Sequence, residues 1–152
     1  MSGVINNMKL VIQRVTNASV SVSGEIVGEI DAGLLVLLGI KTGDTHKEAD
    51  VLAMKLSKLR VMSDALGKMN LSVKESGGQI LVVSQFTLYG DTTGGNRPSF
   101  ITAARPEDSE PLYEYFIAQL KSLGLGVSTG KFGADMQIAA ALDGPVTIVM
   151  EY

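Results

Sequence analysis

Cysteine and tryptophan are absent from the 152-residue sequence, and the only histidine is His46. Without cysteine the chain has no disulfide framework, no thiolate nucleophile and no zinc site built on thiolates. His46 stands in the polar segment GDTHKEAD, where we expect a solvent-exposed side chain near the start of a helix. A Ser-His-Asp relay would have to use this residue, a histidine-based metal site could use it only once, and a solvated histidine is the more common case at such a position. We therefore expect neither a Ser-His-Asp relay nor a metal.

Long apolar runs and an excess of basic residues are also absent. No run approaches the ~20 residues that a membrane-spanning helix needs, and MSGVINN lacks the basic region and apolar core of a signal peptide. The formal net charge is −3, whereas a protein that follows a nucleic-acid backbone needs many lysines and arginines to contact phosphates. We therefore expect a cytoplasmic protein that binds no membrane and no DNA, and that touches at most the tip of a nucleic acid.

The remaining composition predicts one folded domain. Hydrophobic residues make up 45% of the chain and charged residues 19%, as in globular proteins. Alternation and turn residues predict strands at 8–16, 18–23, 25–30, 34–40 and 80–89, a hairpin around DALGK, and C-terminal strands at LGVST, ADMQIAAAL and PVTIVMEY. We expect residues 1–7 to form a flexible extension and residues 8–152 to form the domain.

Two helices are predicted between the strands. Thr45 and Glu48 have the spacing of a capping box, which marks the start of the first helix. Ser109 is the expected N-cap of the second helix, with Pro111 in its first turn and Gly124 after its end. The predicted fold is a single α/β domain of largely antiparallel sheets, with the two helices packed on one face.

The segment ILVVSQFTLYG changes from apolar to polar at four consecutive residues, Ser84, Gln85, Phe86 and Thr87. Serine and threonine are common in strands, so an ordinary strand end is one interpretation. An acyl-transfer site is the other, because backbone N–H groups at an irregular strand end, a hydroxyl and an amide can stabilise a developing oxyanion. Thr87 is a further candidate nucleophile, but it needs a base to activate its hydroxyl and the sequence places none beside it.

The segment LDGPVT also allows two interpretations. Asp-Gly-Pro is common in turns, and proline is tolerated as the first residue of a strand. The functional alternative is that Gly144 and Pro145 present rigid backbone carbonyls to a ligand.

Two glycine-bearing loops are less specific indicators of a ligand site. GDTTGGNRPSF matches no phosphate-binding motif, and Arg97 in that loop and Lys131 in GKFGADM are typical of solvated loops.

Taken together, these segments resemble the D-aminoacyl-tRNA deacylase family. The resemblance extends from about Met8 to the C-terminus and rests on MKLVIQRV, GLLVLLGI with GDT after it, GKMNLSV, SQFTLYGD, RPSF, GKFGADM and DGPVT, in this order. The SQFT and Gly-Pro segments correspond to the two signature motifs of the family. One difference is Leu142, which stands where the family usually has asparagine and therefore bears on how the loop that follows is anchored.

The resemblance implies a three-layer fold and a homodimeric editing hydrolase without cofactor or metal. Such an enzyme cleaves the ester at the acceptor end of D-aminoacyl-tRNA and also removes glycine mischarged onto tRNA. Carried over to this sequence, the catalytic residues are Ser84, Gln85, Phe86 and Thr87, of which Phe86 and Thr87 contribute backbone donors. The residues expected to bind substrate are Gly144, Pro145, Phe132, Gly133, Ala134 and Met136.

The resemblance also implies a chiral filter. Gly144 and Pro145, joined by a cis bond, are expected to enter the partner subunit's site and occupy the space that an L side chain needs. Arg14 is expected to brace this pair by hydrogen bonding. The 2′-hydroxyl of the tRNA itself is expected to assist catalysis, so that no protein base is required. Contacts to tRNA phosphates are expected from Arg97, Arg105 and Lys131.

Three alternatives remain open at the level of sequence. The first is an esterase in which Thr87 forms an acyl intermediate. The second is a catalytically silent module that binds RNA ends. The third is the same scaffold with selectivity against a different acyl group.

Overall fold

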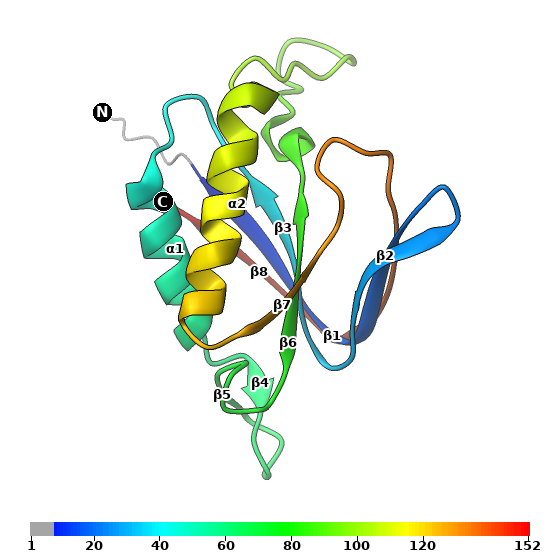
Figure 1. The fold of residues 1–152 in the computed structure, drawn as a ribbon, viewed down its shortest axis with the longest axis vertical. Helices are drawn as coiled ribbons and strands as arrows, with labels where there is room; N and C mark the ends of the chain where they lie inside the picture. The colour runs from blue at the N-terminus through cyan, green and yellow to red at the C-terminus, as the bar shows by residue number, and fades with distance from the viewer. Residues whose placement is uncertain (1–7) are drawn as a thin grey trace.

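Strand β1 (Lys9–Val22) organises the sheet in the computed structural model, which describes residues 8–152. Its first half pairs antiparallel with β3 (Gly33–Gly39), and its second half pairs antiparallel with β2 (Glu25–Ile30). The last strand, β8 (Gln137–Glu151), runs antiparallel along the other side of β1. One strand therefore bonds to three others (Figure 1).

The sheet continues from β3 through two parallel pairings. Strand β6 (Gln79–Ser84) lies beside β3, and β7 (Gly126–Thr129) lies beside β6. A separate antiparallel hairpin is formed by β4 (Met62–Ser63) and β5 (Met69–Leu71), as the turn DALGK predicts. The sheet is therefore mixed, with antiparallel pairing around β1 and parallel pairing around β6.

The sheet curls until its outer strands approach one another. Gly28 of β2 lies against Thr129 of β7, so closely that a Cβ atom on residue 28 would stand 2.2 Å from the Thr129 carbonyl oxygen. Across the same approach, Ser128 Oγ donates a hydrogen bond to the Glu29 carbonyl oxygen at 3.1 Å. Glycine at position 28 therefore permits the near-barrel shape of the sheet.

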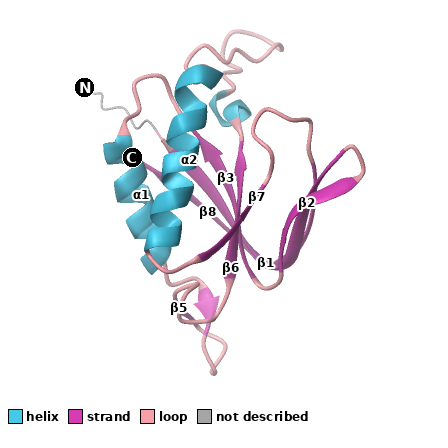
Figure 2. Cartoon of the chain, in the orientation of Figure 1, coloured by secondary structure: helices cyan, strands magenta, loops and turns pink. Residues whose placement is uncertain are grey.

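Two apolar cores result from this curl. The larger core lies between one face of the sheet and the helices α1 (His46–Lys58) and α2 (Pro106–Ser122), which lie side by side on that face (Figure 2). Its fully buried side chains include Leu52, Phe116 and Leu120 from the helices. The smaller core lies inside the curl and contains Val15, Val20, Ile30, Leu35, Leu81 and Val83. The two cores thus lie on opposite faces of one curled sheet, and the helices cover the larger core.

The predicted helices are both present, but the start of the second is corrected. The capping box of α1 is formed by Thr45 and Glu48 as predicted. Helix α2 begins at Pro106 with Arg105 as its N-cap, so Ser109 is a buried helical residue and no cap. Proline favours the first helical position because its φ is already helical. Pro106 occupies that position, and Pro111 lies inside the helix.

Three predicted strand boundaries are also corrected. The segment 80–89 does not continue as a strand, because β6 ends at Ser84 and the 3₁₀ helix η1 (Phe86–Tyr89) follows. Segments 8–16 and 18–23 join into the single strand β1, and the two last predicted segments join into β8. Bulges opposite β1 absorb the Asp-Gly-Pro sequence without ending the strand.

Two further sequence expectations concern the N-terminal residues and membrane-spanning helices. The expected flexible extension, residues 1–7, lies outside the described residues. Between residues 8 and 152, neither helix is long and apolar enough to cross a membrane. The described residues form a single α/β domain.

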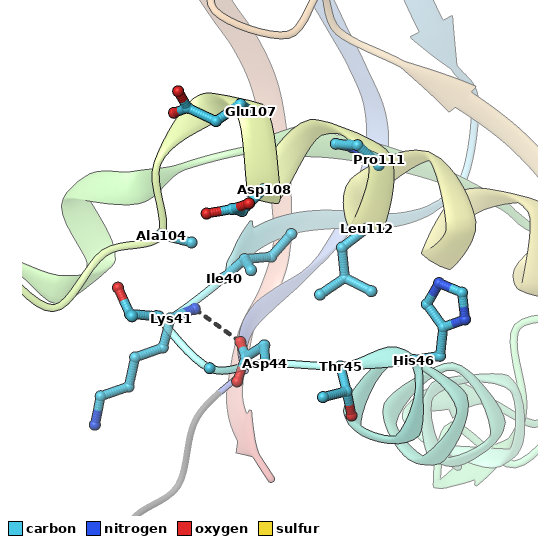
Figure 3. Close-up of a pocket in the computed structure, with 12 residues that line it drawn as sticks. Ile40, Lys41, Asp44, Thr45, His46, Ala104, Glu107, Asp108, Pro111 and Leu112 are labelled. Carbon is cyan, nitrogen blue, oxygen red and sulfur yellow. Dashed lines mark hydrogen bonds between the residues drawn. The ribbon is translucent and has the colours of Figure 1, made fainter.

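A cavity of about 400 Å³ lies between the loop that precedes α1 and the first turns of α2 (Figure 3). Asp44 lines it, and its Oδ2 accepts a hydrogen bond from the Lys41 backbone N–H at 2.7 Å. The other carboxylate oxygen, Oδ1, is buried and has no partner within residues 8–152. Burial, reinforced by the nearby Glu48, raises the pKa of Asp44 to about 6. The ionised form of Asp44 is therefore unfavourable in the folded chain.

This arrangement predicts a pH-dependent stability. In the unfolded chain Asp44 ionises near its ordinary pKa of 3.8, so between pH 4 and 6 the folded chain holds a proton that the unfolded chain has lost. Stability contributed by this group is therefore lost as the pH rises through about 6. We expect Asp44→Asn to gain in free energy of unfolding, relative to the original chain, between pH 4 and pH 7. Urea denaturation at both pH values measures this difference, and a difference independent of pH contradicts the assignment.

Candidate active site

The polar run SQFT begins at the carboxyl edge of the two parallel strands. Ser84 ends β6, and the backbone N–H of Gln85 donates a hydrogen bond to the Leu38 carbonyl oxygen of β3 at 2.8 Å. In open α/β sheets, ligands bind outside the carboxyl ends of parallel strands, where the chain leaves the sheet. The run therefore lies at an edge suited to ligand binding, immediately before the chain turns into η1.

The first residues of η1 offer backbone donors. N–H groups at the start of a helix have no carbonyl one turn earlier to bond within the helix, which applies to Phe86 and Thr87. The Thr87 hydroxyl accepts a hydrogen bond from the Gln85 side-chain amide. The Phe86 ring is 57% exposed and packs edge-on against Phe100, with ring centroids 5.2 Å apart. Two amides thus lie beside an aromatic wall.

A cavity of about 610 Å³ adjoins this turn. Its volume lies in the range of small-molecule sites. The predicted site residues that line it are Ser84, Gln85, Phe86, Phe132, Gly133, Ala134 and Met136. Thr87 is next to these residues in the chain but does not line the cavity. The structure thus brings together two segments that are distant in sequence. SQFT lies at the end of β6, and GKFGADM lies just before β8.

The wall formed by GKFGADM is held by the sheet and by α2. The Gly130 backbone N–H donates to the Val82 carbonyl oxygen at 3.1 Å, which continues the contact between β7 and β6. The Ala134 N–H closes a turn onto the Lys131 carbonyl oxygen at 3.2 Å. The Phe132 ring then lies against Tyr113 of α2, with ring centroids 5.5 Å apart. Backbone bonds and ring packing together fix this wall.

The third wall was not identified from the sequence. It contains Phe100, Ala103, Ala104, Pro106 and Ser109, from the loop before α2 and the first turns of that helix. RPSF belongs to the family resemblance, but in sequence only its arginine suggests a ligand contact. The pattern at Ser109 predicts a helix cap, and only the true helix start at Pro106 shows that this residue faces inward. No local signal marks these residues as neighbours of SQFT.

Gly144 and Pro145 lie in an interruption of β8. Gln13 pairs with Thr147, whereas Val15 pairs with Leu142, so residues 143–146 bulge out of the ladder opposite residue 14. The Gly144-Pro145 peptide bond is cis. Both residues are exposed, and neither lines the 610 Å³ cavity of its own chain. The structure therefore does not unite this pair with SQFT within one chain.

Arg14 holds the base of this bulge. Its side chain is almost fully buried, and Nη1 donates hydrogen bonds to the Val61 carbonyl oxygen at 2.9 Å and to Ser63 Oγ at 3.3 Å. Its Nε donates to the Asp143 carbonyl oxygen at 3.3 Å and lies 3.2 Å from Asp143 Oδ2. Arg14 thus ties the residue before Gly144 to the hairpin region, which is the contact that a bracing role requires.

The remaining candidates lie on the surface. His46 is the first residue of α1, is exposed and stacks on Tyr115 with ring centroids 3.8 Å apart, which confirms the expected environment of the only histidine. Arg97, Arg105 and Lys131 are all exposed. Their contact with tRNA phosphates stays a prediction.

Comparisons with known proteins agree on one family. The family model described as D-Tyr-tRNA(Tyr) deacylase matches residues 11–151. The D-aminoacyl-tRNA deacylase of Brevibacillus brevis is 55% identical over 144 residues, which are 95% of this chain and 99% of that protein. The D-aminoacyl-tRNA deacylase of Lacticaseibacillus casei is 54% identical over 144 residues, which are 95% of this chain and 97% of that protein.

Two solved structures are similar to the fold. A structure titled "c-Myc DNA Unwinding Element Binding Protein" has a TM-score of 0.89 at 44% identity and covers 95% of this chain and 98% of its own. A probable eukaryotic D-amino acid tRNA deacylase has a TM-score of 0.85 at 14% identity and covers 96% of this chain and 100% of its own, a likeness of fold alone. With the family model matched from residue 11 to residue 151 and more than half of all positions shared with the bacterial enzymes, the chain belongs to the D-aminoacyl-tRNA deacylase family and is a carboxylic ester hydrolase.

Proposed function

We propose that the cavity beside SQFT binds the aminoacyl end of D-aminoacyl-tRNA and positions its ester for hydrolysis. The observation that carries this proposal is the convergence of the two predicted segments, SQFT and GKFGADM, on one cavity of about 610 Å³. Aromatic side chains on both segments offer flat surfaces for the terminal adenosine, and adenine stacks well on such rings. The products are the free amino acid and the tRNA.

Catalysis in this proposal depends on position and on hydrogen-bond donors. In this proposal the backbone N–H groups of Phe86 and Thr87, which have no carbonyl partner within η1, stabilise the oxyanion that forms on the ester carbonyl. Ser84 and Gln85 shape and polarise the same wall. An aminoacyl ester is already activated, so that holding it in line with a water supplies much of the acceleration. We assign the assisting base to the tRNA 2′-hydroxyl, because the chain's only histidine is stacked on Tyr115.

We infer that Gly144 and Pro145 act on the cavity of a second subunit in a homodimer. They are exposed, they do not line their own cavity, and Arg14 holds the preceding residue in place. Strand β8, which carries them, bonds on one side to β1 and leaves Ile138, Leu142 and Val149 exposed. Backbone carbonyls held in this way can exclude an L side chain by occupying its space. Glycine has no side chain to exclude, so glycyl-tRNA would also be hydrolysed.

The same proposal accounts for the charge of the chain. Binding of only the acceptor end neutralises few phosphates, so affinity should depend weakly on salt. Arg97, Arg105 and Lys131 are exposed and available for those contacts. A net charge of −3 is compatible with such a partner. We place the enzyme in the cytoplasm, where aminoacyl-tRNA is made and used.

A deacylation assay on matched substrates tests the function. We expect D-tyrosyl-tRNA and glycyl-tRNA to be hydrolysed and L-tyrosyl-tRNA to be spared, because the filter excludes by shape. The measurement is the release of labelled amino acid with time. Binding of tRNA without release of any amino acid supports a silent RNA-binding module. Equal cleavage of both stereoisomers supports selectivity for a different acyl group.

Thr87→Ala separates the two hydrolytic mechanisms. The Thr87 hydroxyl bonds to Gln85 and does not line the cavity, so we expect kcat for D-tyrosyl-tRNA to stay within about threefold of the original value, as for the loss of one neutral hydrogen bond. If Thr87 formed an acyl intermediate, the variant would be inactive. Single-turnover kinetics measure the chemical step directly.

A charge on the exposed face of β8 tests the proposed dimer. Leu142 is 49% exposed in the monomer, so Leu142→Glu leaves the monomer core intact but places a charge where the subunits would meet. We expect a monomer by analytical ultracentrifugation and a loss of deacylation of at least about 100-fold. Met54→Glu, on the exposed face of α1 and 42% exposed, is the matched control and should remain dimeric and active. An active monomer contradicts the trans arrangement.

A further inference from the structure

Ser109 is a buried polar residue in the wall of the 610 Å³ cavity that the family motifs do not include. It lies in the first turns of α2, exposes 8% of its surface and lines the cavity together with Ala103, Ala104 and Pro106. Its backbone N–H is used by the helix, since it donates to the Arg105 carbonyl oxygen at 2.8 Å. The side-chain hydroxyl, by contrast, makes no hydrogen bond to residues 8–152. Its oxygen is not one of the fully enclosed unpaired atoms of the described residues, so it is accessible from the cavity.

A hydroxyl that opens onto a cavity can bond to water or to a ligand. Polar groups away from bulk solvent nearly always have a partner in folded proteins, so whatever occupies the cavity is expected to supply one. Ser57 and Ser122, also in the helices, each donate to a backbone carbonyl oxygen of their own helix at 2.7 Å. Ser109 does not fold back onto its helix in this way. Its hydroxyl is therefore free to bond to whatever occupies the cavity.

The charge of the cavity indicates which group that is. Among the residues that line it, Asp135 is the only one with a charged side chain, and no lysine or arginine is present. A cavity with one carboxylate, neutral oxygen atoms and no cation favours a positively charged ligand group. An aminoacyl ester carries one such group, the α-ammonium beside the scissile carbonyl. A hydroxyl oxygen can accept a hydrogen bond from an ammonium, and bonds to charged groups are the stronger kind.

We propose that the Ser109 hydroxyl accepts a hydrogen bond from the α-ammonium group of the bound aminoacyl moiety and so distinguishes an amino acid ester from an ester without the amine. This inference rests on the proposed function, because it requires the aminoacyl end to occupy this cavity. Ser109 is a substrate-contacting residue that sets affinity and orientation. It performs no proton transfer. The contact is made from α2, whereas the oxyanion donors belong to η1.

Paired variants of protein and ligand test the contact. The probes are two non-hydrolysable adenosine 3′-amides, one carrying D-alanine and the other carrying propionic acid, which lacks only the amine. We expect Ser109→Ala to weaken binding of the D-alanyl amide about 10-fold, as for loss of one hydrogen bond to a charged group. Binding of the propionyl amide should change by less than about twofold. Calorimetric titration gives both dissociation constants.

The controls separate this contact from a structural role. Ser122→Ala, at the exposed end of the same helix, should bind both amides as the original chain does. Ser109→Ala should keep the melting temperature of the free protein, since the hydroxyl bonds to none of residues 8–152. Equal weakening of both amides, or no weakening of either, overturns the assignment of Ser109 while leaving the proposed function intact. Failure of the original chain to bind either amide overturns the proposed function together with this inference.

Discussion

Backbone pairing of β1 with three other strands is the constraint on which the site depends. Along one side β1 fixes β3, and β3 in turn fixes the parallel strand β6, whose carboxyl end begins SQFT. Along its other side β1 fixes β8, and the bulge of residues 143–146 opens where Arg14 replaces ladder pairing by side-chain bonds. The cavity and the Gly-Pro pair therefore take their positions from opposite sides of the same strand.

That geometry is consistent with an esterase whose cavity contains no histidine and no cysteine. The cavity has backbone donors on one wall, an aromatic ring on each of its three walls and a single charged side chain. Such a site is suited to holding an activated ester and to excluding competing shapes, and it does not require a strong base. The exposed apolar side chains of β8 are the kind of surface that a partner covers, and in the proposed homodimer a second subunit would cover both this face and the Gly-Pro pair.

Local patterns predicted the elements better than their ends. The capping box of α1, the buried strand β3 and the β4–β5 hairpin follow from residues close together in sequence, and each is present. The predicted start of α2 at Ser109 was wrong, because either of two prolines could take the first helical position and Pro106 occupies it. The prediction of a strand after Ser84 was wrong. The backbone N–H of Gln85 bonds to the Leu38 carbonyl oxygen and the chain then turns into η1, and the alternation of apolar and polar residues does not indicate such a turn.

The amino-acid sequence by itself determined the class of fold, the family and the two candidate site segments, because these depend on periodicity, turn chemistry and a set of motifs in order. Only the tertiary structure decided that SQFT and GKFGADM share one cavity, that Phe100 and Ser109 complete it, and that Gly144 and Pro145 stand outside it. The physical reason is that hydrophobic burial and strand pairing act between residues far apart in the chain, so the neighbours of a side chain are set by packing and not by sequence distance.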